Sequence, residues 1–423
     1  MSPSGLLKAG VGTRAITPPL GVELYRYEPN TPRKSRSARR AMLAHAVVIE
    51  SGNTRVAIIA ADLFSVSREL TEATQALLLE MTDIPPENVI LCATHTHSAP
   101  ETVSRIGGAT LDSLYLQMLP RLFASSVMEA IDKLEEVNAY VGQATLNGLG
   151  VNRLQEDGYV DTAVQTLEFM GEGSDYVLFN FGCKPTSTPI DDLEIDPDFP
   201  HRARAILEAE YDTAVFLQGS CGDVNSVYAH NWETARCGQM LAGATLISVG
   251  QSELIDGNAT LDCYQKTVQL PVVQHDTEDL MRHRDDMRLL VKAAPDHPFS
   301  EMLQKSSDEI YATAIARLEQ SVSLTRACSV RIIRLGDVAI VAHPFKLFAE
   351  VALDIKRRSP FRQTFLVGLA NDYLGYLTTS ALLQSNLHFT DLPSYALGHT
   401  PLAPEATEVF VLEIIEMLQT LKA

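Results

Sequence analysis

The sequence lacks the features that mark membrane-bound, secreted or nucleic-acid-binding proteins. No apolar run approaches the roughly 18 residues of a membrane-spanning helix, and the N-terminal segment has no charged-then-apolar signal pattern. Lys and Arg number 34 against 53 Asp and Glu, so the net charge of −19 argues against nucleic acid or an anionic membrane as a partner. We therefore expect a cytoplasmic protein that binds a small-molecule substrate.

Cysteine is sparse, and its placement is irregular. The six cysteines are scattered without a CxxC pair or a dense framework, which indicates reduced thiols rather than disulfides. Cys183 and Cys221 adjoin polar segments of the chain. We interpret both as small apolar fillers rather than as nucleophiles.

The chain also lacks internal repeats, low-complexity tracts and a clear linker. Its 423 residues, 46% of them apolar, are enough for one large domain with a sizeable core, so we expect a single domain over residues 1–423. A charged helical insertion is expected near residues 275–322. It would form a subdomain or a homo-oligomer contact, or alternatively a helical layer over a sheet.

Short apolar runs between turn residues predict β-strands along most of the chain. The predicted strands are residues 44–50, 55–61, 88–93, 138–146, 163–170, 176–182, 213–218, 327–335, 338–342 and 364–369. The runs 327–335 and 338–342 predict a hairpin around Gly336-Asp337.

Runs with helical spacing alternate with these strands. The predicted helices are residues 68–81, 111–134, 201–210, 234–250, 277–291, 345–358 and 406–421. Pro120 predicts a kink or break in the second of them. The alternation predicts an α/β protein with a layered mixed β-sheet core flanked by helices.

The sequence Thr94-His95-Thr96-His97 follows one of the predicted strands directly. Because strand side chains alternate between faces, His95 and His97 are expected to point the same way. Two imidazoles at a strand end bind a metal, or divide into a ligand and an acid/base. The alternative is a polar pair that fills a turn, but the spacing favours a functional site.

Polar clusters follow several other apolar strands. They are Asp62 and residues 183–187, 218–225, 343–346 and 371–376. In layered α/β folds, sites form where the carboxyl ends of strands converge, so these clusters together predict one site. The basic segment 33–40 has two interpretations, a solvated loop or a flap over an anionic substrate group.

Six short motifs occur in order along the chain. They are Ala9-Gly10-Val11-Gly12 with Ile16-Thr17-Pro18-Pro19-Leu20-Gly21, Ala93-Thr94-His95-Thr96-His97-Ser98, Asn152-Arg153, Gly182-Cys183-Lys184-Pro185-Thr186-Ser187, Gly222-Asp223-Val224-Asn225, and the segment from Gly368-Leu369-Ala370-Asn371 to Tyr376-Leu377-Thr378-Thr379. With them the chain resembles the catalytic domain of the neutral/alkaline (non-lysosomal) ceramidases and their bacterial relatives. The resemblance implies that fold, without the family's C-terminal immunoglobulin-like domain.

The resemblance also implies a site that has lost two of its four metal ligands. Family members hydrolyse an N-acyl amide with one zinc, held by residues at the positions of His95, Lys184, Lys346 and Tyr376, and the two lysines replace a His and a Glu. Zinc takes neutral His, thiolate or carboxylate, whereas an ammonium has no lone pair. Two ammonium groups 4 Å apart also repel by about 4 kcal/mol at an effective dielectric near 20. We therefore expect no cofactor and disfavour zinc.

The lysines suggest other chemistry at the same place. The ammonium groups of Lys184 and Lys346 would polarise a carbonyl or hold an anion, and a lysine with a lowered pKa would act as a nucleophile or general base. His97 would be a second acid/base, Arg153 an anion or oxyanion partner, and Tyr376 a proton relay or substrate-orienting group.

Further residues complete the expected site. Asp223 and Asp62 would fix the His and Lys side chains. The expected substrate-binding residues are Asn152, Asn225, Asn371, Tyr373 and His388.

The sequence thus favours a repurposed enzyme. It would act without a metal on an amide, acyl or related carbonyl group of a small polar or anionic substrate, by hydrolysis, acyl transfer or cyclisation in a biosynthetic pathway. One alternative is a zinc-dependent amide hydrolase with an altered ligand set that uses His343 or an aspartate. Another is a catalytically inactive binding paralogue. No lipid-binding signature is present, so ceramide is not the expected substrate.

Overall fold

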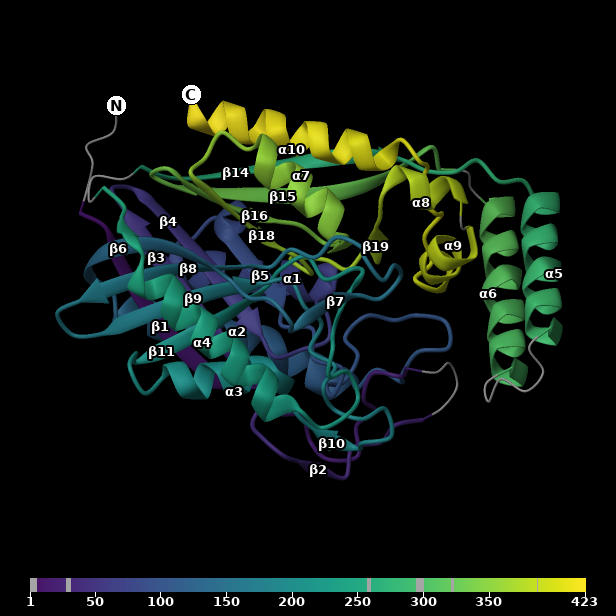
Figure 1. Cartoon of the computed structure of the whole chain (residues 1–423), viewed down its shortest axis with the longest axis horizontal. Coiled ribbons are helices and arrows are strands. Elements are labelled where there is room, and N and C mark those ends of the chain that lie inside the picture. The colour runs from purple at the N-terminus through teal and green to yellow at the C-terminus, as the bar shows by residue number, and fades with distance from the viewer. Residues whose placement is uncertain (1–5, 28–31, 257–259, 294–299, 321–322, 386) are drawn as a thin grey trace.

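Two β-sheets stack face to face, and helices cover their outer faces (Figure 1). The computed structural model describes residues 6–27, 32–256, 260–293, 300–320, 323–385 and 387–423. The core between the sheets contains residues of both, such as Ile90, Ile340 and Phe365. This arrangement confirms the predicted α/β class with a layered mixed sheet core.

The larger sheet has the strand order β11-β9-β8-β6-β1-β3-β4-β5, with β13 also paired to β6. Its strands are β1 (Lys8–Ala15), β3 (Leu43–Ser51), β4 (Thr54–Ala61), β5 (Val89–Ala93), β6 (Glu135–Thr145), β8 (Ala163–Gly171), β9 (Asp175–Phe181), β11 (Thr213–Gln218) and β13 (Glu253–Leu254). The edge pairs β4–β5 and β9–β11 are parallel, and the pairs between them are antiparallel. The polar segments after β5, β9 and β11 are those that the sequence assigns to the site.

The smaller sheet has the order β14-β15-β16-β18. Its strands are β14 (Leu261–Pro271), β15 (Thr325–Leu335), β16 (Val338–Ala342) and β18 (Gln363–Val367). The predicted hairpin joins β15 to β16, and its turn residue Gly336 has a φ of 59°. Because β16 and β18 are parallel, the segments after them leave the sheet on the same side. These segments meet in a short parallel pairing of β17 (Lys346–Leu347) with β19 (Tyr376–Leu377).

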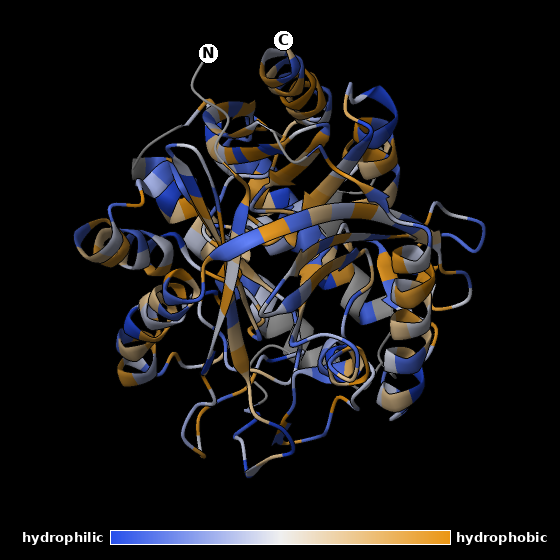
Figure 2. Ribbon diagram, turned by 90° about the vertical axis from the view of Figure 1, so that its left-hand side faces the viewer, coloured by the Kyte–Doolittle hydropathy of each residue, from blue (hydrophilic) through white to orange (hydrophobic). Residues whose placement is uncertain are grey.

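Helices pack on both outer faces through apolar stripes, and Figure 2 shows them carrying apolar and hydrophilic residues around the sheets. The larger sheet is covered by α1 (Arg68–Thr82), α2 (Ser113–Asp132), α3 (Asp198–Leu207) and α4 (Thr234–Gly250), and the smaller one by α7 (Ala349–Arg358) and α10 (Ala406–Lys422). Remaining short elements are β2 (Ser37–Ala38), η1 (Pro86–Asn88), β7 (Gly150–Asn152), β10 (Glu194–Ile195) and β12 (Val224–Ser226). No helix in the described ranges is long and apolar enough to cross a membrane.

The charged insertion forms two helices at one end of the molecule. They are α5 (Thr277–Ala293) and α6 (Ser300–Gln320), which lie beside α8 (Ser380–Ser385) and α9 (Leu387–Ala396) (Figure 1). Leu280, Tyr311 and Tyr395 belong to a small separate core that joins α5, α6 and α9. The insertion is thus packed to the rest of the chain mainly through α9.

Two local predictions need correction. Of the kink or break expected at Pro120, the break is absent, because helix α2 continues through the proline. Buried Leu119, Phe123 and Val127 pack the helix against the larger sheet on both sides of it. The helix predicted from residue 345 begins only at Ala349, because the residues before it pair with β19 as a strand. In both places tertiary contacts outweigh local propensity.

Candidate active site

Three polar segments are joined by backbone pairing at the site. β7 pairs antiparallel with β12, which places Asn152 opposite Val224 and Val151 opposite Asn225. Lys184 bridges to Asn225, and its N–H donates to the Val224 carbonyl at 3.2 Å. The backbone therefore fixes the positions from which Arg153 and Lys184 extend.

The carbonyl oxygen of Gly222 brings two cations together. It accepts hydrogen bonds from Lys184 Nζ at 3.0 Å and from Arg153 Nη2 at 3.2 Å. The Gly222 N–H donates to the Leu347 carbonyl at 2.8 Å, and a Cβ on Gly222 would lie only 2.7 Å from the Lys346 carbonyl oxygen. This close approach requires glycine and brings the strand that carries Lys346 against the other two cations.

Tyr376 lies among these cations. Lys346 Nζ is 3.8 Å from the centre of its ring and Lys184 Nζ is 5.7 Å away, while Arg153 Nη2 donates to the Tyr376 hydroxyl at 3.1 Å. Burial alone raises the pKa of Tyr376, but the charges of Lys346, Lys184 and Arg153 together lower it to about 6. At neutral pH the site therefore favours a phenolate.

Both lysines are buried, with exposed fractions of 4% for Lys184 and 6% for Lys346. Burial lowers the pKa of Lys184 to about 8, and the negative charge of Tyr376 opposes that change. Burial likewise lowers the pKa of Lys346. A phenolate between two ammonium groups is thus the charge state that the surroundings stabilise near neutral pH.

The two histidines of the HxH motif lie next to each other, with ring centres 4.9 Å apart. His95 has a φ of 70°, and its Nδ1–H donates to the Phe64 carbonyl at 2.7 Å, which leaves the lone pair on the buried Nε2. Burial lowers the pKa of His95 well below its usual value, and the charge of Lys346 adds to this effect. Burial and the neighbouring His95 do the same to the pKa of His97. Both imidazoles are therefore neutral at pH 7.

His97 is enclosed by aromatic rings that the sequence did not assign to the site. The ring centres of Tyr25, Tyr27 and Phe64 lie 4.6, 5.1 and 5.1 Å from that of His97. Within the described residues, neither ring nitrogen of His97 has a hydrogen-bond partner. The two closely spaced aromatic residues in the Tyr-Arg-Tyr sequence at 25–27 could have indicated the aromatic surroundings of His97.

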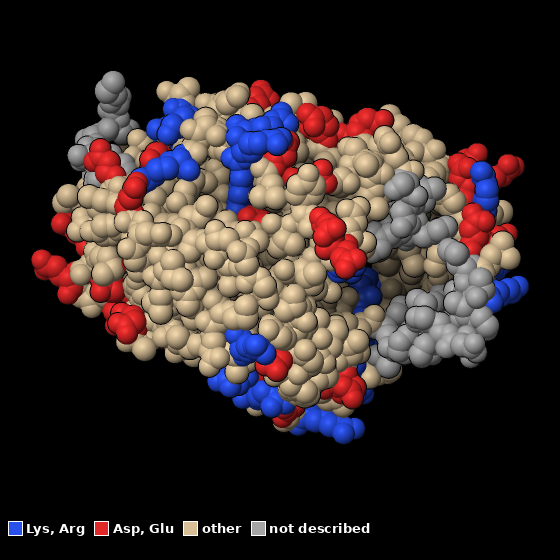
Figure 3. Space-filling view, viewed as in Figure 1, with Lys and Arg blue, Asp and Glu red and all other residues tan. Residues whose placement is uncertain are grey.

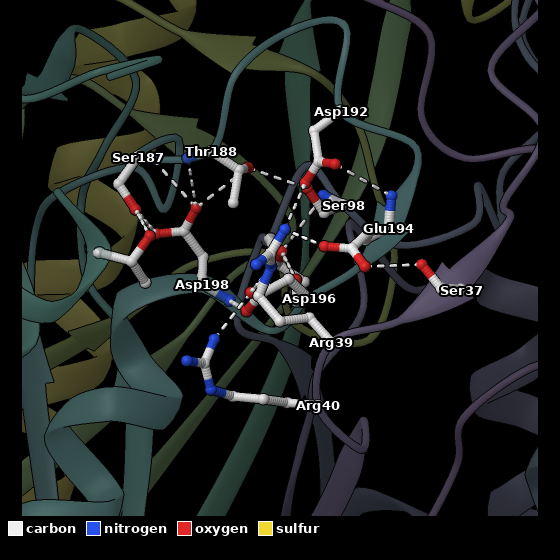
Figure 4. A network of polar contacts seen from close by, with 12 residues as sticks. Ser37, Arg39, Arg40, Ser98, Ser187, Thr188, Asp192, Glu194, Asp196 and Asp198 are labelled. Carbon is white, nitrogen blue, oxygen red and sulfur yellow. Dashed lines mark hydrogen bonds and ion pairs between the residues drawn. The ribbon is translucent and has the colours of Figure 1, made fainter. Parts of the chain in front are cut away.

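Three arginines of the basic segment 33–40, Arg33, Arg39 and Arg40, contact protein groups. Arg33 is 5% exposed and donates to the carbonyl oxygens of Tyr25 at 2.6 Å, His97 at 3.1 Å and Asp192 at 2.7 Å. Arg39 and Arg40 pair with carboxylates of the segment 192–196 (Figure 4). Figure 3 shows Lys and Arg gathered with a few acidic residues along the lower edge, where Figure 1 places β2 and β10. The described contacts therefore give these arginines a structural role.

The same network anchors the loop that carries the HxH motif (Figure 4). The Ser98 and Thr188 hydroxyls hydrogen-bond at 2.9 Å, and the Thr96 hydroxyl donates to the Asp196 carbonyl at 2.6 Å. The Asp198 carboxylate accepts from the hydroxyl and N–H of Ser187 and from the N–H of Thr188. The histidines are thus held by a second layer of buried polar contacts.

The expected supporting aspartates have different surroundings. Asp223 accepts from Asn152 Nδ2 at 2.9 Å and from the Ala349 N–H at 2.9 Å, so it holds the loops that carry the cations. Asp62 instead forms a buried bidentate ion pair with Arg204 at 3.0 and 2.6 Å. The prediction that Asp62 fixes the His and Lys side chains is wrong, because Arg204 occupies its carboxylate.

Two of the expected substrate-binding residues accept hydrogen bonds from the backbone, and a third lies beside Lys346. The Asn371 side-chain oxygen accepts from the Leu91 N–H at 2.9 Å, and the Asn152 side-chain oxygen accepts from the N–H groups of residues 154 and 155. Asn225 is half-buried in β12. Tyr373 is buried, with its ring centre 5.2 Å from Lys346 Nζ. His388 falls within α9, but its side chain lies outside the described residues.

A cavity of about 190 Å³ opens beside Lys346 and Tyr376. Its polar lining also includes Tyr25, Arg105 and Tyr373. The apolar lining comes from Ile106, Ile310, Leu392, Pro393, Ala396 and Leu397, so α6 and α9 supply part of the wall. The cavity suits a small molecule with one polar or anionic end and a short apolar part.

The residues at the site do not suit zinc. Lys184 already donates to the Gly222 carbonyl, and its ammonium offers a metal no lone pair. Lys346 and Arg153 add two further cations around Tyr376, which would repel a divalent ion. Of the four positions that the resemblance gives as zinc ligands, only His95 and Tyr376 keep a side chain that can bind zinc, fewer than the three protein ligands that catalytic zinc sites use.

Comparisons with solved structures identify the fold of this chain. No protein-family model and no curated protein matches the chain. The crystal structure of neutral ceramidase from Pseudomonas aeruginosa matches with a TM-score of 0.77 and 18% identity, over 98% of this chain and 74% of that one. A structure described as ceramidase complexed with C2 matches with a TM-score of 0.76 and 18% identity, over 99% and 75%. The chain therefore has the neutral ceramidase catalytic-domain fold, as the motifs predicted.

Proposed function

We propose that this protein is a metal-independent enzyme that acts on an amide, acyl or related carbonyl group of a small polar or anionic substrate. The ceramidase-like fold supplies a hydrolase-like scaffold. The observation that carries the proposal is the arrangement of Lys184, Lys346 and Arg153 around Tyr376. Hydrolysis, acyl transfer and cyclisation all pass through the same charged intermediate at a carbonyl.

The cations would stabilise negative charge that develops on the carbonyl oxygen. Lys346 lines the cavity, whereas Lys184 and Arg153 contact Tyr376 and are held by the Gly222 carbonyl. Because these groups are fixed before the substrate arrives, they need little reorganisation during the reaction. One such donor is typically worth a factor of about 10² to 10³ in kcat. The same cations would attract the anionic end of a substrate.

Tyr376 would move the proton. As a phenolate it accepts a proton from the attacking water, amine or hydroxyl group, and it then returns that proton to the leaving group. Its lowered pKa, about 6, suits a base that works near neutral pH. His97 is neutral and adjoins His95, so it supplies a second group that can accept or donate a proton.

The experiment is an assay of chelator-treated protein against N-acyl amino acids and short acidic amides. We expect turnover without added metal, and loss of that turnover in Lys184→Ala with the protein still folded by circular dichroism. Lys266→Ala is the matched control, because Lys266 lies on β14, does not line the cavity, and pairs with Glu413 and Glu416 of α10.

Three results would contradict the proposal. Turnover that requires zinc bound at His95, and loses that zinc in His95→Ala, would support the altered zinc hydrolase instead. Full turnover in Lys184→Ala would remove that lysine from the mechanism. Ligand binding without turnover, unchanged by His97→Ala, would indicate a binding paralogue.

A further inference from the structure

A second group of potential metal ligands lies outside the candidate active site. His275 precedes α5, His283 lies within α5, and Asp391 lies on α9. One ligand atom from each lies within 4.8 Å of the other two. Among the described residues, no other group of three His, Cys, Asp or Glu side chains has this spacing.

We propose that His275, His283 and Asp391 bind one divalent transition-metal ion, of which zinc is the best match. Two imidazoles and one carboxylate form a ligand set that zinc uses with water in the fourth position. Tetrahedral zinc holds such atoms about 3.4 Å apart, given bonds of about 2.0–2.1 Å. Side-chain movements that shift the ligand atoms by roughly 1 Å would bring all three to that spacing.

The surroundings of the two imidazoles support this assignment. Their ring centres are 4.8 Å apart and the ring planes are nearly perpendicular, at 85°. Tyr395 Oη lies 2.7 Å from His275 Nδ1, and such an outer hydrogen bond commonly orients a metal-binding imidazole. His283 is 8% exposed and Asp391 2% exposed, so a bound ion would be largely shielded from bulk water.

The local charges also favour a cation. The carboxylates of Asp276 and Asp279 act electrostatically on His275, and Arg282 is the nearby opposing charge. A separate cavity of about 300 Å³ is lined by His275 and Tyr395 and offers an entry path.

Metal binding here would stabilise a wall of the candidate active site. The three ligands join α5 to α9, and α9 contributes Leu392 and Pro393 to the cavity beside Tyr376. The small separate core that includes Leu280 and Tyr395 joins the same helices. A bound ion would therefore order the insertion against the rest of the chain, and the inference stands independently of the proposed reaction.

The test uses the full chain after removal of metals with a chelator. Zinc binding is followed by calorimetry and cobalt binding by visible absorption, and we expect about one ion per chain and a higher unfolding temperature with metal. His283→Ala and Asp391→Asn are each expected to weaken binding more than tenfold, and the second substitution keeps the side-chain shape. Tyr395→Phe keeps all three ligands and is expected to weaken binding about tenfold or more.

His201→Ala and His95→Ala are the matched controls and should bind like the unchanged protein. Absence of zinc and cobalt binding would overturn the inference and leave a hydrogen-bonded cluster only. Equal affinity in folded His283→Ala and Asp391→Asn would do the same. Loss of the ion in His95→Ala would place the metal at the HxH motif, which would also contradict the metal-independent reaction. Failure of that reaction alone would leave this site unaffected.

Discussion

Lys346 and Tyr376 occupy opposite positions in a parallel pairing of two short strands, with Lys346 Nζ 3.8 Å from the centre of the tyrosine ring. The backbone register therefore sets the contact between a cation and the group whose pKa it lowers. Because β16 and β18 lead into these two strands, the smaller sheet fixes the distance between them. The predictions below begin with the chemical consequence of this pair.

The first prediction concerns Tyr376→Phe. We expect kcat to fall by about 10² to 10⁴, the usual contribution of a general acid–base group. The free energy of unfolding should fall as well, because Lys184 and Lys346 are buried and lose their negative neighbour. In the unchanged enzyme, activity should fall below about pH 6 as Tyr376 gains a proton, and above about pH 8 as Lys184 loses one. Ultraviolet absorbance should detect the phenolate, and its signal should vanish in the variant. An unchanged acidic limb in Tyr376→Phe would assign that limb to another group.

The second prediction concerns Gly222→Ala. The new Cβ would lie 2.7 Å from the Lys346 carbonyl oxygen and from Phe348 Cδ1, so the backbone that carries Lys346 must move. We expect kcat to fall more than about tenfold, since a misplaced electrostatic donor forfeits most of its effect. Gly243→Ala is the matched control, because no atom from outside its own stretch of helix α4 lies within 4 Å of the added Cβ, and alanine favours the helix by about 1 kcal/mol. Equal activity in both variants would contradict the role given to Gly222.

The third prediction concerns the buried ion pair of Asp62 and Arg204, whose side chains are 0% and 1% exposed. Asp62→Ala removes one partner and leaves an uncompensated buried guanidinium, so the free energy of unfolding should fall by about 3–5 kcal/mol. Denaturant unfolding measures the change. The exposed pair of Lys133 and Glu129 serves for comparison, and Lys133→Ala should cost less than about 1 kcal/mol. A small loss in Asp62→Ala would show that water reaches Arg204.

The fourth prediction concerns stability in acid. Burial lowers the pKa of His343 to about 3, so the unfolded chain binds a proton below pH 6.5 that the folded chain does not. Its contribution to stability is present above pH 6.5 and is lost as the pH falls toward 3. His343→Gln should reduce the slope of unfolding free energy against pH by about 1.4 kcal/mol per unit over that range. An unchanged slope would show that His343 is protonated in the folded state.

Much of the fold was predictable because its strands and helices follow strong periodic patterns. The strands around the turn at Gly52 and the helix at residues 234–250 occur where the sequence indicates them. The exceptions depend on contacts between distant segments. Lys346 and Leu347 continue a helical pattern, yet they pair with Tyr376 and Leu377 as a strand. Such pairing cannot be found from local spacing.

The site was predictable where it is built from motifs, and less so elsewhere. His95, Lys184, Lys346 and Tyr376 lie together as the resemblance implied. Tyr25 and Phe64 come from loops without periodicity, and only the tertiary structure brings their rings to His97. The partner of Asp62 was also hidden, because Arg204 is 142 residues away in sequence.

The left-handed backbone of His95 has a consequence for directed evolution of this protein. A non-glycine residue at a φ of 70° costs of order 1–3 kcal/mol, and glycine or asparagine would relieve part of that cost. A screen that rewards heat resistance alone should therefore enrich replacements at His95 early. The variants that survive best would then be those that have discarded the imidazole with which the HxH motif begins.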